Sequence, residues 1–206
     1  NSQFTLLSNL IQNVRTDDKP LIQVIEKYRN RRLEPSKQDS KTIGELLDAF
    51  IETVKSCKIE EDVYKFCSAS FEGKLYDNFA AETEGLIERP EAKLINFFVV
   101  FSEVESEEKK RKNKMIALFK SIYPSTYELL KDFKNRVGSE YLPIFLQAIE
   151  SIIFVDELFI LLYRQLIETL TKHDSISLKD TDLKEGKRII KAYLNQVLGV
   201  NRYELG

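Results

Sequence analysis

Few residues of this chain have the types and spacing that catalysis or metal binding requires. His173 is the only histidine among 206 residues. Ser-His-Asp triads, His–Cys metal sites and di-iron sites each need more partners than one histidine supplies. We therefore interpret His173, followed by Asp174, as a helix-terminal histidine near the negative end of a helix dipole. The nucleotide-binding patterns GxGxxG and GxxxxGK[ST] do not occur either.

The two cysteines are Cys57 and Cys67, ten residues apart. A catalytic cysteine needs a paired histidine, and a zinc site needs two more ligands, so core cysteines are the favoured interpretation. Two cysteines are too few for a secreted disulfide scaffold. We expect no metal, no cofactor and no enzymatic activity, and we expect a reduced, cytoplasmic environment.

Charged residues interrupt the most apolar stretch, Tyr141 to Tyr163. Asp156 and Glu157 lie in its middle, where a buried carboxylate is costly unless it is paired. They could mark a site. The favoured interpretation is that they face a wet groove or pair with Lys or Arg of a neighbouring helix. Arg164, two helical turns after Asp156, is a forked donor suited to a carboxylate or phosphate if it faces a cleft, and otherwise forms its own salt bridge.

One strongly basic run could bind an anionic surface. It consists of Lys109, Lys110, Arg111, Lys112 and Lys114. Four glutamates precede it from position 103, so the two blocks largely cancel through i,i+4 pairs along one helix. A solvated helix end is therefore favoured over a nucleic-acid or anionic-membrane patch. The net charge of -2 and the pI near 5.7 also argue against nucleic acid as a partner.

The elements that must position these residues are helices. Hydrophobic residues make up 43% and charged residues 31% of the chain, with only 7 Gly and 5 Pro. The sequence predicts one all-α domain over 1–206, an antiparallel bundle or irregular array of about seven to nine helices. No stretch reaches the ~20 nearly uncharged residues that a membrane span needs, and no N-terminal signal pattern is visible.

Helix boundaries follow from capping signals and breakers. We expect a first helix over 3–15, a second from Pro20 that stops before Pro35, and a polar linker over 34–41 that separates this pair from the main bundle. Thr42 and Glu45 predict a capping box. The longest helix is expected over about 140–172, followed by a loop over 173–181 and a last helix from about 182 to 198.

Four segments follow one another along the chain: 75–79 (LYDNF), 94–100 (LINFFVV), the helix end 141–143 (YLP) and 162–168 (LYRQLIE). Their order resembles that of the 14-3-3 family, whose members are helical dimers that bind phosphorylated peptides. The last segment is similar to the family's Tyr-Tyr-Arg-Tyr-Leu-Ala-Glu. The resemblance implies a dimer in which Arg164 binds the phosphate.

The leading functional hypothesis is a non-enzymatic helical adaptor that acts as a homodimer and binds protein segments in an inter-helix groove. In its more specific form, the bound segments are phosphopeptides. Its candidate ligand-binding residues are Tyr163, Arg164 and Asp156. The alternative is a structural subunit or scaffold of a larger intracellular assembly, in which the apolar girdle 152–163 meets another chain. The third hypothesis is anionic-membrane or nucleic-acid binding through Lys109–Lys114.

Overall fold

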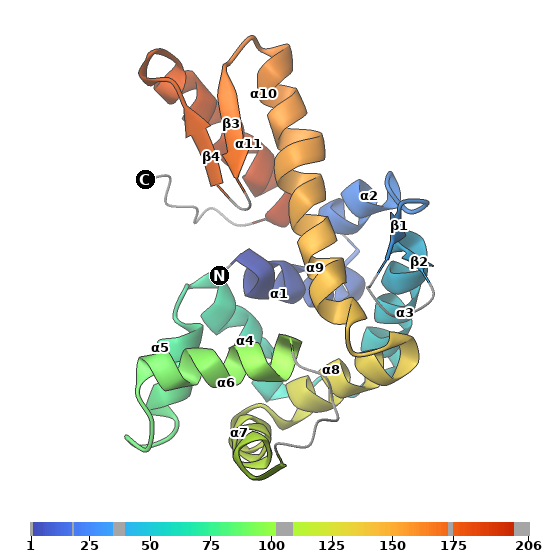
Figure 1. Cartoon of the computed structure of the whole chain (residues 1–206), viewed down its shortest axis with the longest axis vertical. Helices are drawn as coiled ribbons and strands as arrows, with labels where there is room; N and C mark the ends of the chain where they lie inside the picture. The colour runs from blue at the N-terminus through green and yellow to red at the C-terminus, as the bar shows by residue number, and fades with distance from the viewer. Residues whose placement is uncertain (1, 18, 35–39, 102–108, 173–174, 200–206) are drawn as a thin grey trace.

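In a computed structural model of the chain, the described residues are 2–17, 19–34, 40–101, 109–172 and 175–199 (Figure 1). They are mostly helical, with two small two-stranded sheets, so the prediction of an all-α helical array is confirmed. The elements are α1 (Ser2–Arg15), α2 (Pro20–Glu26), β1 (Arg32–Leu33), β2 (Lys41–Thr42), α3 (Ile43–Ser56), α4 (Glu61–Phe71), α5 (Leu75–Ala81), α6 (Arg89–Phe101), α7 (Lys109–Ile122), α8 (Pro124–Val137), α9 (Tyr141–Ser151), the π-helix η1 (Ile152–Phe159), α10 (Ile160–Arg164), β3 (Thr169–Lys172), β4 (Ser175–Leu178), the 3-10 helix η2 (Asp180–Asp182) and α11 (Leu183–Leu198).

Several helix ends lie where the sequence places them. The Thr42 hydroxyl accepts a hydrogen bond from the Glu45 backbone N–H at 3.1 Å, and the Glu45 carboxylate accepts one from the Thr42 N–H at 2.6 Å. This is the predicted capping box, and it begins α3. Pro20 and Pro124 lie at the first positions of α2 and α8. Gly138 follows α8 with a φ of 106°, a value that glycine adopts readily.

Helix α1 lies at the centre of the core and packs against α2, α3, α4 and α9. Its buried Asn13 side chain accepts a hydrogen bond from the Leu21 N–H at 3.0 Å, which fixes the start of α2. The ring of Phe4 makes edge-on contacts with four aromatic rings of α4, α5 and α6, those of Phe66, Tyr76, Phe97 and Phe101. Edge-on ring pairs of this kind add to the stability that burial supplies.

The second helix is shorter than predicted, because the following segment bonds to α3 instead. Helix α2 ends at Glu26, and β1 pairs antiparallel with β2. The carbonyl of Arg29 accepts a hydrogen bond from the Gly44 N–H at 2.8 Å, and that of Arg31 accepts one from the Ile43 N–H at 2.9 Å. These bonds satisfy N–H groups of the first turn of α3. Most of the expected linker over 34–41 lies outside the described residues.

The longest helix is also shorter than predicted. Helices α9, η1 and α10 form one continuous rod from Tyr141 to Arg164, which does not reach residue 172. Strands β3 and β4 follow as a hairpin in which Thr169 pairs with Leu178. Along this hairpin, half-buried and exposed residues alternate, which is the two-residue period of a strand and not the period of a helix. The segment expected to be a loop over 173–181 therefore contains β4 and the first two residues of η2.

The rod connects two parts of the molecule. In Figure 1 its lower end lies among the helices of the core, and its upper end lies beside the hairpin. Helix α11 packs against α2 and closely against the hairpin, since a Cβ atom at Gly186 would lie only 2.6 Å from Leu178 Cδ1. Among the described residues, every helix is too short or too polar to cross a lipid bilayer.

Candidate functional site

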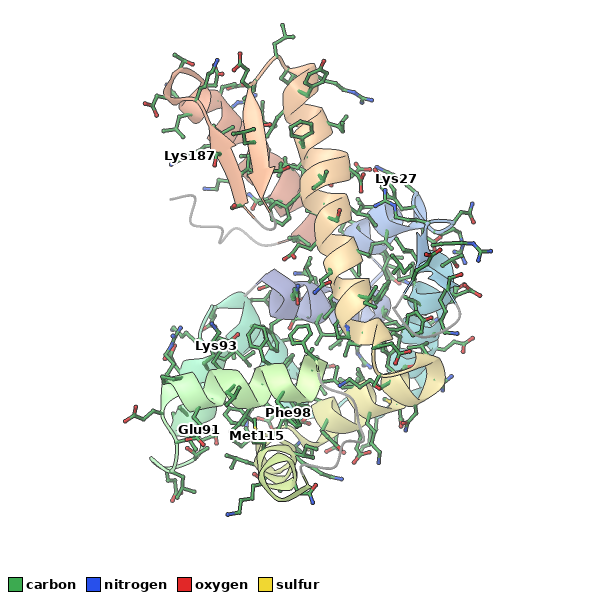
Figure 2. The ribbon with its side chains drawn as sticks, viewed as in Figure 1. Lys27, Glu91, Lys93, Phe98, Met115 and Lys187 are labelled. Atoms are coloured by element: carbon green, nitrogen blue, oxygen red, sulfur yellow. The ribbon has the colours of Figure 1, made fainter. Side chains whose placement is uncertain are left out.

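The two carboxylates of the apolar rod, Asp156 and Glu157, form ion pairs with the segment that directly follows α2. Asp156 pairs with Arg31 at 2.7 Å. Both Glu157 oxygens accept hydrogen bonds from Lys27 Nζ, at 3.0 and 3.1 Å, and one also accepts from the Tyr28 hydroxyl at 2.9 Å. Figure 2 shows Lys27 beside the rod. The interpretation that these carboxylates pair with neighbouring cations is thus confirmed.

This ion-pair cluster shifts the ionisation of its members. The hydrogen bond to Asp156 raises the pKa of Arg31 above its ordinary value. Burial, followed by the hydrogen bond to Glu157, raises the pKa of Tyr28 to about 12. The Arg31 guanidinium also lies 4.9 Å from the centre of the Tyr28 ring. Both groups hold their protons at neutral pH, and the cluster ties the rod to the segment that follows α2.

Tyr163 and Arg164 lie at the upper end of the rod, away from that cluster. Tyr163 is 68% exposed, and its ring stacks on Phe159 with ring centres 6.5 Å apart. Arg164 is the last residue of α10 and is exposed, with no ion pair to another described residue. The three candidate residues Tyr163, Arg164 and Asp156 therefore lie in different surroundings and do not converge on one ligand position.

A pocket of about 710 Å³ lies between the end of the rod and the hairpin. Tyr163 is one of its walls, whereas Arg164 is not among the residues that line it. The lining is predominantly apolar and consists of Phe159, Tyr163, Leu166, Ile167, Glu168, Thr169, Leu170, Ser177, Leu178 and Lys179. Its size and composition are those of a site that receives apolar groups.

Three lining side chains of this pocket are strongly exposed. Leu166 is 91% exposed, Leu170 is 76% exposed, and both lie close in the chain to Tyr163. We call these three residues and the pocket the α10–hairpin patch. The sequence predicts Tyr163 as a candidate binding residue, but neither leucine. The signal that could have found Leu170 is the order Thr169-Leu170-Thr171. In a strand, successive side chains point to opposite faces, so the leucine lies on the other face from its two threonine neighbours.

Leu166 adopts a backbone conformation that is unusual for leucine. The Leu166 N–H bonds to the Tyr163 carbonyl at 3.0 Å, and the Ile167 N–H bonds to the Leu162 carbonyl at 3.1 Å. This is the Schellman pattern of a helix end, in which the left-handed residue is normally glycine. Here that residue is Leu166, with a φ of 60°. Ile167 and Leu162, the two positions that form the accompanying apolar contact in this motif, are both buried.

The basic run lies at the other end of the molecule. Helix α7, which contains it, is at the bottom of Figure 1, whereas α10 is at the top. Lys114 is exposed. The side chains of Lys109, Lys110, Arg111 and Lys112 lie outside the described part of the chain, as do the glutamates that precede them. The basic run and the α10–hairpin patch are thus separate surfaces.

Both cysteines are in environments that suppress thiolate formation. Cys67 is buried, and burial raises its pKa to about 11. Cys57 is half-buried, and burial together with the nearby Asp132 raises its pKa. His173 lies outside the described residues. Within the described ranges, no group of three or more His, Cys, Asp or Glu side chains is placed to hold a metal ion.

Comparisons with protein-family models, with curated proteins and with solved structures each gave no match. The resemblance to the 14-3-3 family therefore stays a prediction from the sequence.

Proposed function

We propose that this chain is a non-enzymatic protein-interaction module that buries the α10–hairpin patch against a partner protein. The observation that carries the proposal is the clustering of Tyr163, Leu166 and Leu170, all strongly exposed, around one apolar pocket. Single exposed apolar residues are common on protein surfaces, but a cluster around a recess is typical of an interaction site. Tyr163 adds an aromatic side chain of the kind that dominates binding energy.

The geometry favours an apolar group over a phosphate as the group that is bound. Arg164 lies at the carboxyl end of α10, where the helix dipole disfavours an anion. The sharper, phosphopeptide form of the adaptor hypothesis is tested by Arg164→Ala. If a phosphopeptide library binds this variant as well as it binds the original chain, phosphate recognition through Arg164 is excluded.

A direct test of the module compares two leucines of similar exposure. Leu166 belongs to the patch, whereas Leu86 is 79% exposed on a different part of the chain. We expect Leu166→Glu to lose the proteins that the original chain captures from its source cell, and Leu86→Glu to retain them. Equal capture by both variants would contradict the proposal.

The structural-subunit alternative places the contact at the apolar girdle 152–163, of which Phe159 and Tyr163 line the pocket, and it predicts different behaviour of the isolated chain. A subunit separated from its assembly would aggregate and bind a hydrophobic dye strongly, whereas an autonomous adaptor would stay monodisperse. Light scattering with dye fluorescence, measured for the original chain and for Leu166→Glu, separates the two.

Binding to an anionic membrane or nucleic acid through Lys109–Lys114 has its own test. Such binding weakens steeply with salt and disappears when the lysines become glutamate. An affinity that does not depend on salt would exclude it.

A further inference from the structure

The α10–hairpin patch contains a recess and a projection next to each other. The pocket of about 710 Å³ is the recess, and Leu166, 91% exposed at its edge, is the projection. We propose that a second copy of this chain covers the patch, with Leu166 of each copy entering the pocket of the other. This inference rests on the proposed function and names the partner of that surface.

The shape of the patch meets the requirement of a two-fold interface. In such an interface the same surface is used twice, so it must be complementary to itself, and a surface that has both a projection and a recess can be. Of the residues that line the pocket, Leu166 and Leu170 are strongly exposed, whereas Phe159 and Leu178 are half-buried. The pocket is within the size range that holds small ligands, so it can admit a leucine side chain.

The charges at the rim also fit a second copy. The charged residues that line the pocket are Glu168 and Lys179, which form an ion pair and are both exposed. One acid and one base give no excess that would select an acidic or a basic partner. Across a two-fold axis, the Glu168–Lys179 pairs of the two copies can exchange partners, so that Glu168 of one copy pairs with Lys179 of the other. The two glutamates, and likewise the two lysines, then need not face each other.

The backbone holds the projection in place. Leu166 occupies the left-handed position of a Schellman helix end, where glycine would avoid the steric cost of a side chain. Two backbone hydrogen bonds fix this position, and the buried Ile167 anchors the next residue. A leucine held outward in a strained conformation is explained if it makes a contact that the single chain does not contain.

Sedimentation velocity over a broad concentration range tests the inference on the full chain. We expect a monomer–dimer equilibrium for the original chain and for the control Leu86→Glu, and a monomer for Leu166→Glu. Removing a leucine contact from both halves of the interface should weaken dimerisation roughly a hundredfold.

Leu166→Gly provides the sharper variant because its two expected effects have opposite signs. Dimerisation should weaken, while the melting temperature of the monomer, measured at dilution, should rise because glycine relieves the strained position. A variant that merely damaged the fold would weaken dimerisation and also lower the melting temperature of the monomer. Dimerisation that is unchanged in Leu166→Gly and Leu166→Glu would overturn the inference.

Cross-linking tests the predicted contact directly. In a Cys57→Ser background, a mixture of Leu166→Cys and Ser177→Cys chains should form an inter-chain disulfide, because Ser177 lines the pocket that Leu166 enters. A mixture of Leu86→Cys and Ser177→Cys should not. Absence of the first cross-link in a chain that dimerises would place the interface elsewhere.

Failure of this inference is distinguishable from failure of the proposed function. A chain that is monomeric at all concentrations, yet loses capture of other proteins through Leu166→Glu, would overturn self-association and leave the interaction module standing. If Leu166→Glu changed neither dimerisation nor capture, both proposals would fall.

Discussion

Lys134 is a cation in an environment that disfavours its charge. It is buried in α8, and its Nζ donates a hydrogen bond to the Val99 carbonyl of α6 at 2.7 Å. Burial lowers its pKa from 10.5 to about 8. The folded chain therefore binds this proton less tightly than the unfolded chain does.

The pH dependence of stability should reveal this lysine. Between about pH 8 and 10.5 the unfolded chain keeps the proton while the folded chain has lost it, so the free energy of unfolding rises with pH. The full contribution is about 3 kcal/mol. We expect urea unfolding at pH 7.5 and 9.5 to show this rise in the original chain, relative to Lys134→Met.

The comparison with Lys134→Met is necessary because Cys67 acts in the opposite direction. Burial raises the pKa of Cys67 to about 11, so above the ordinary thiol pKa the unfolded chain loses a proton that the folded chain keeps. Stability conferred by that group falls as the pH rises. Both chains contain Cys67, so its contribution cancels in the difference. Parallel pH profiles for the two chains would show that Lys134 is not titrated in this range.

At the scale of the elements, the end of the rod is the first test. Leu166→Gly should raise the free energy of unfolding of the monomer by about 1 kcal/mol, because glycine adopts the left-handed conformation without steric cost. Urea unfolding at low protein concentration measures the change. Leu166→Ala retains a Cβ atom and should raise the free energy of unfolding by less than half as much as Leu166→Gly does. An equal gain from alanine would mean that the backbone is not strained at this position.

The start of α3 is the second test at this scale. Thr42→Ala removes the hydroxyl that accepts the Glu45 N–H and should lower the free energy of unfolding by about 1 kcal/mol. Thr42→Ser keeps a hydroxyl at that position and should cost much less. Thermal unfolding of the three chains measures both effects, and a similar loss in both variants would assign the stability to the threonine methyl group.

At the scale of the whole molecule, the ion-pair cluster joins segments far apart in the chain. Glu157 is mostly buried and accepts hydrogen bonds from Lys27 and Tyr28. Glu157→Gln should lower the free energy of unfolding by about 2 kcal/mol, because charged hydrogen bonds are lost in a partly buried site. Urea unfolding measures it, and added salt should reduce the difference.

The matched control for the cluster is an exposed ion pair. Glu185 pairs with Arg188 on the surface of α11, so Glu185→Gln should leave the free energy of unfolding almost unchanged. Similar losses from Glu157→Gln and Glu185→Gln would show that burial of the cluster contributes nothing. A large loss confined to Glu157→Gln would confirm that the cluster holds the rod against the end of α2.

The sequence predicted those features that depend on neighbours in the chain. The all-α class, the Thr42 capping box and the proline at the start of α2 each follow from local chemistry, because helix starts are set within one turn. The pairing of Asp156 with a cation was also predictable, since burial of an unpaired carboxylate is too costly. That its partner is Arg31 was not, because the pair spans most of the chain.

The tertiary structure alone decided where the rod ends and what its end presents. The sequence between Arg164 and Thr169 has neither glycine nor proline, so no local signal stops the predicted helix. After the rod, Ile167 is buried at the pocket, and the hairpin packs on the rod and on α11. Long-range burial outweighs the strain at Leu166, and it is this balance that leaves Leu166 and Leu170 exposed around a pocket.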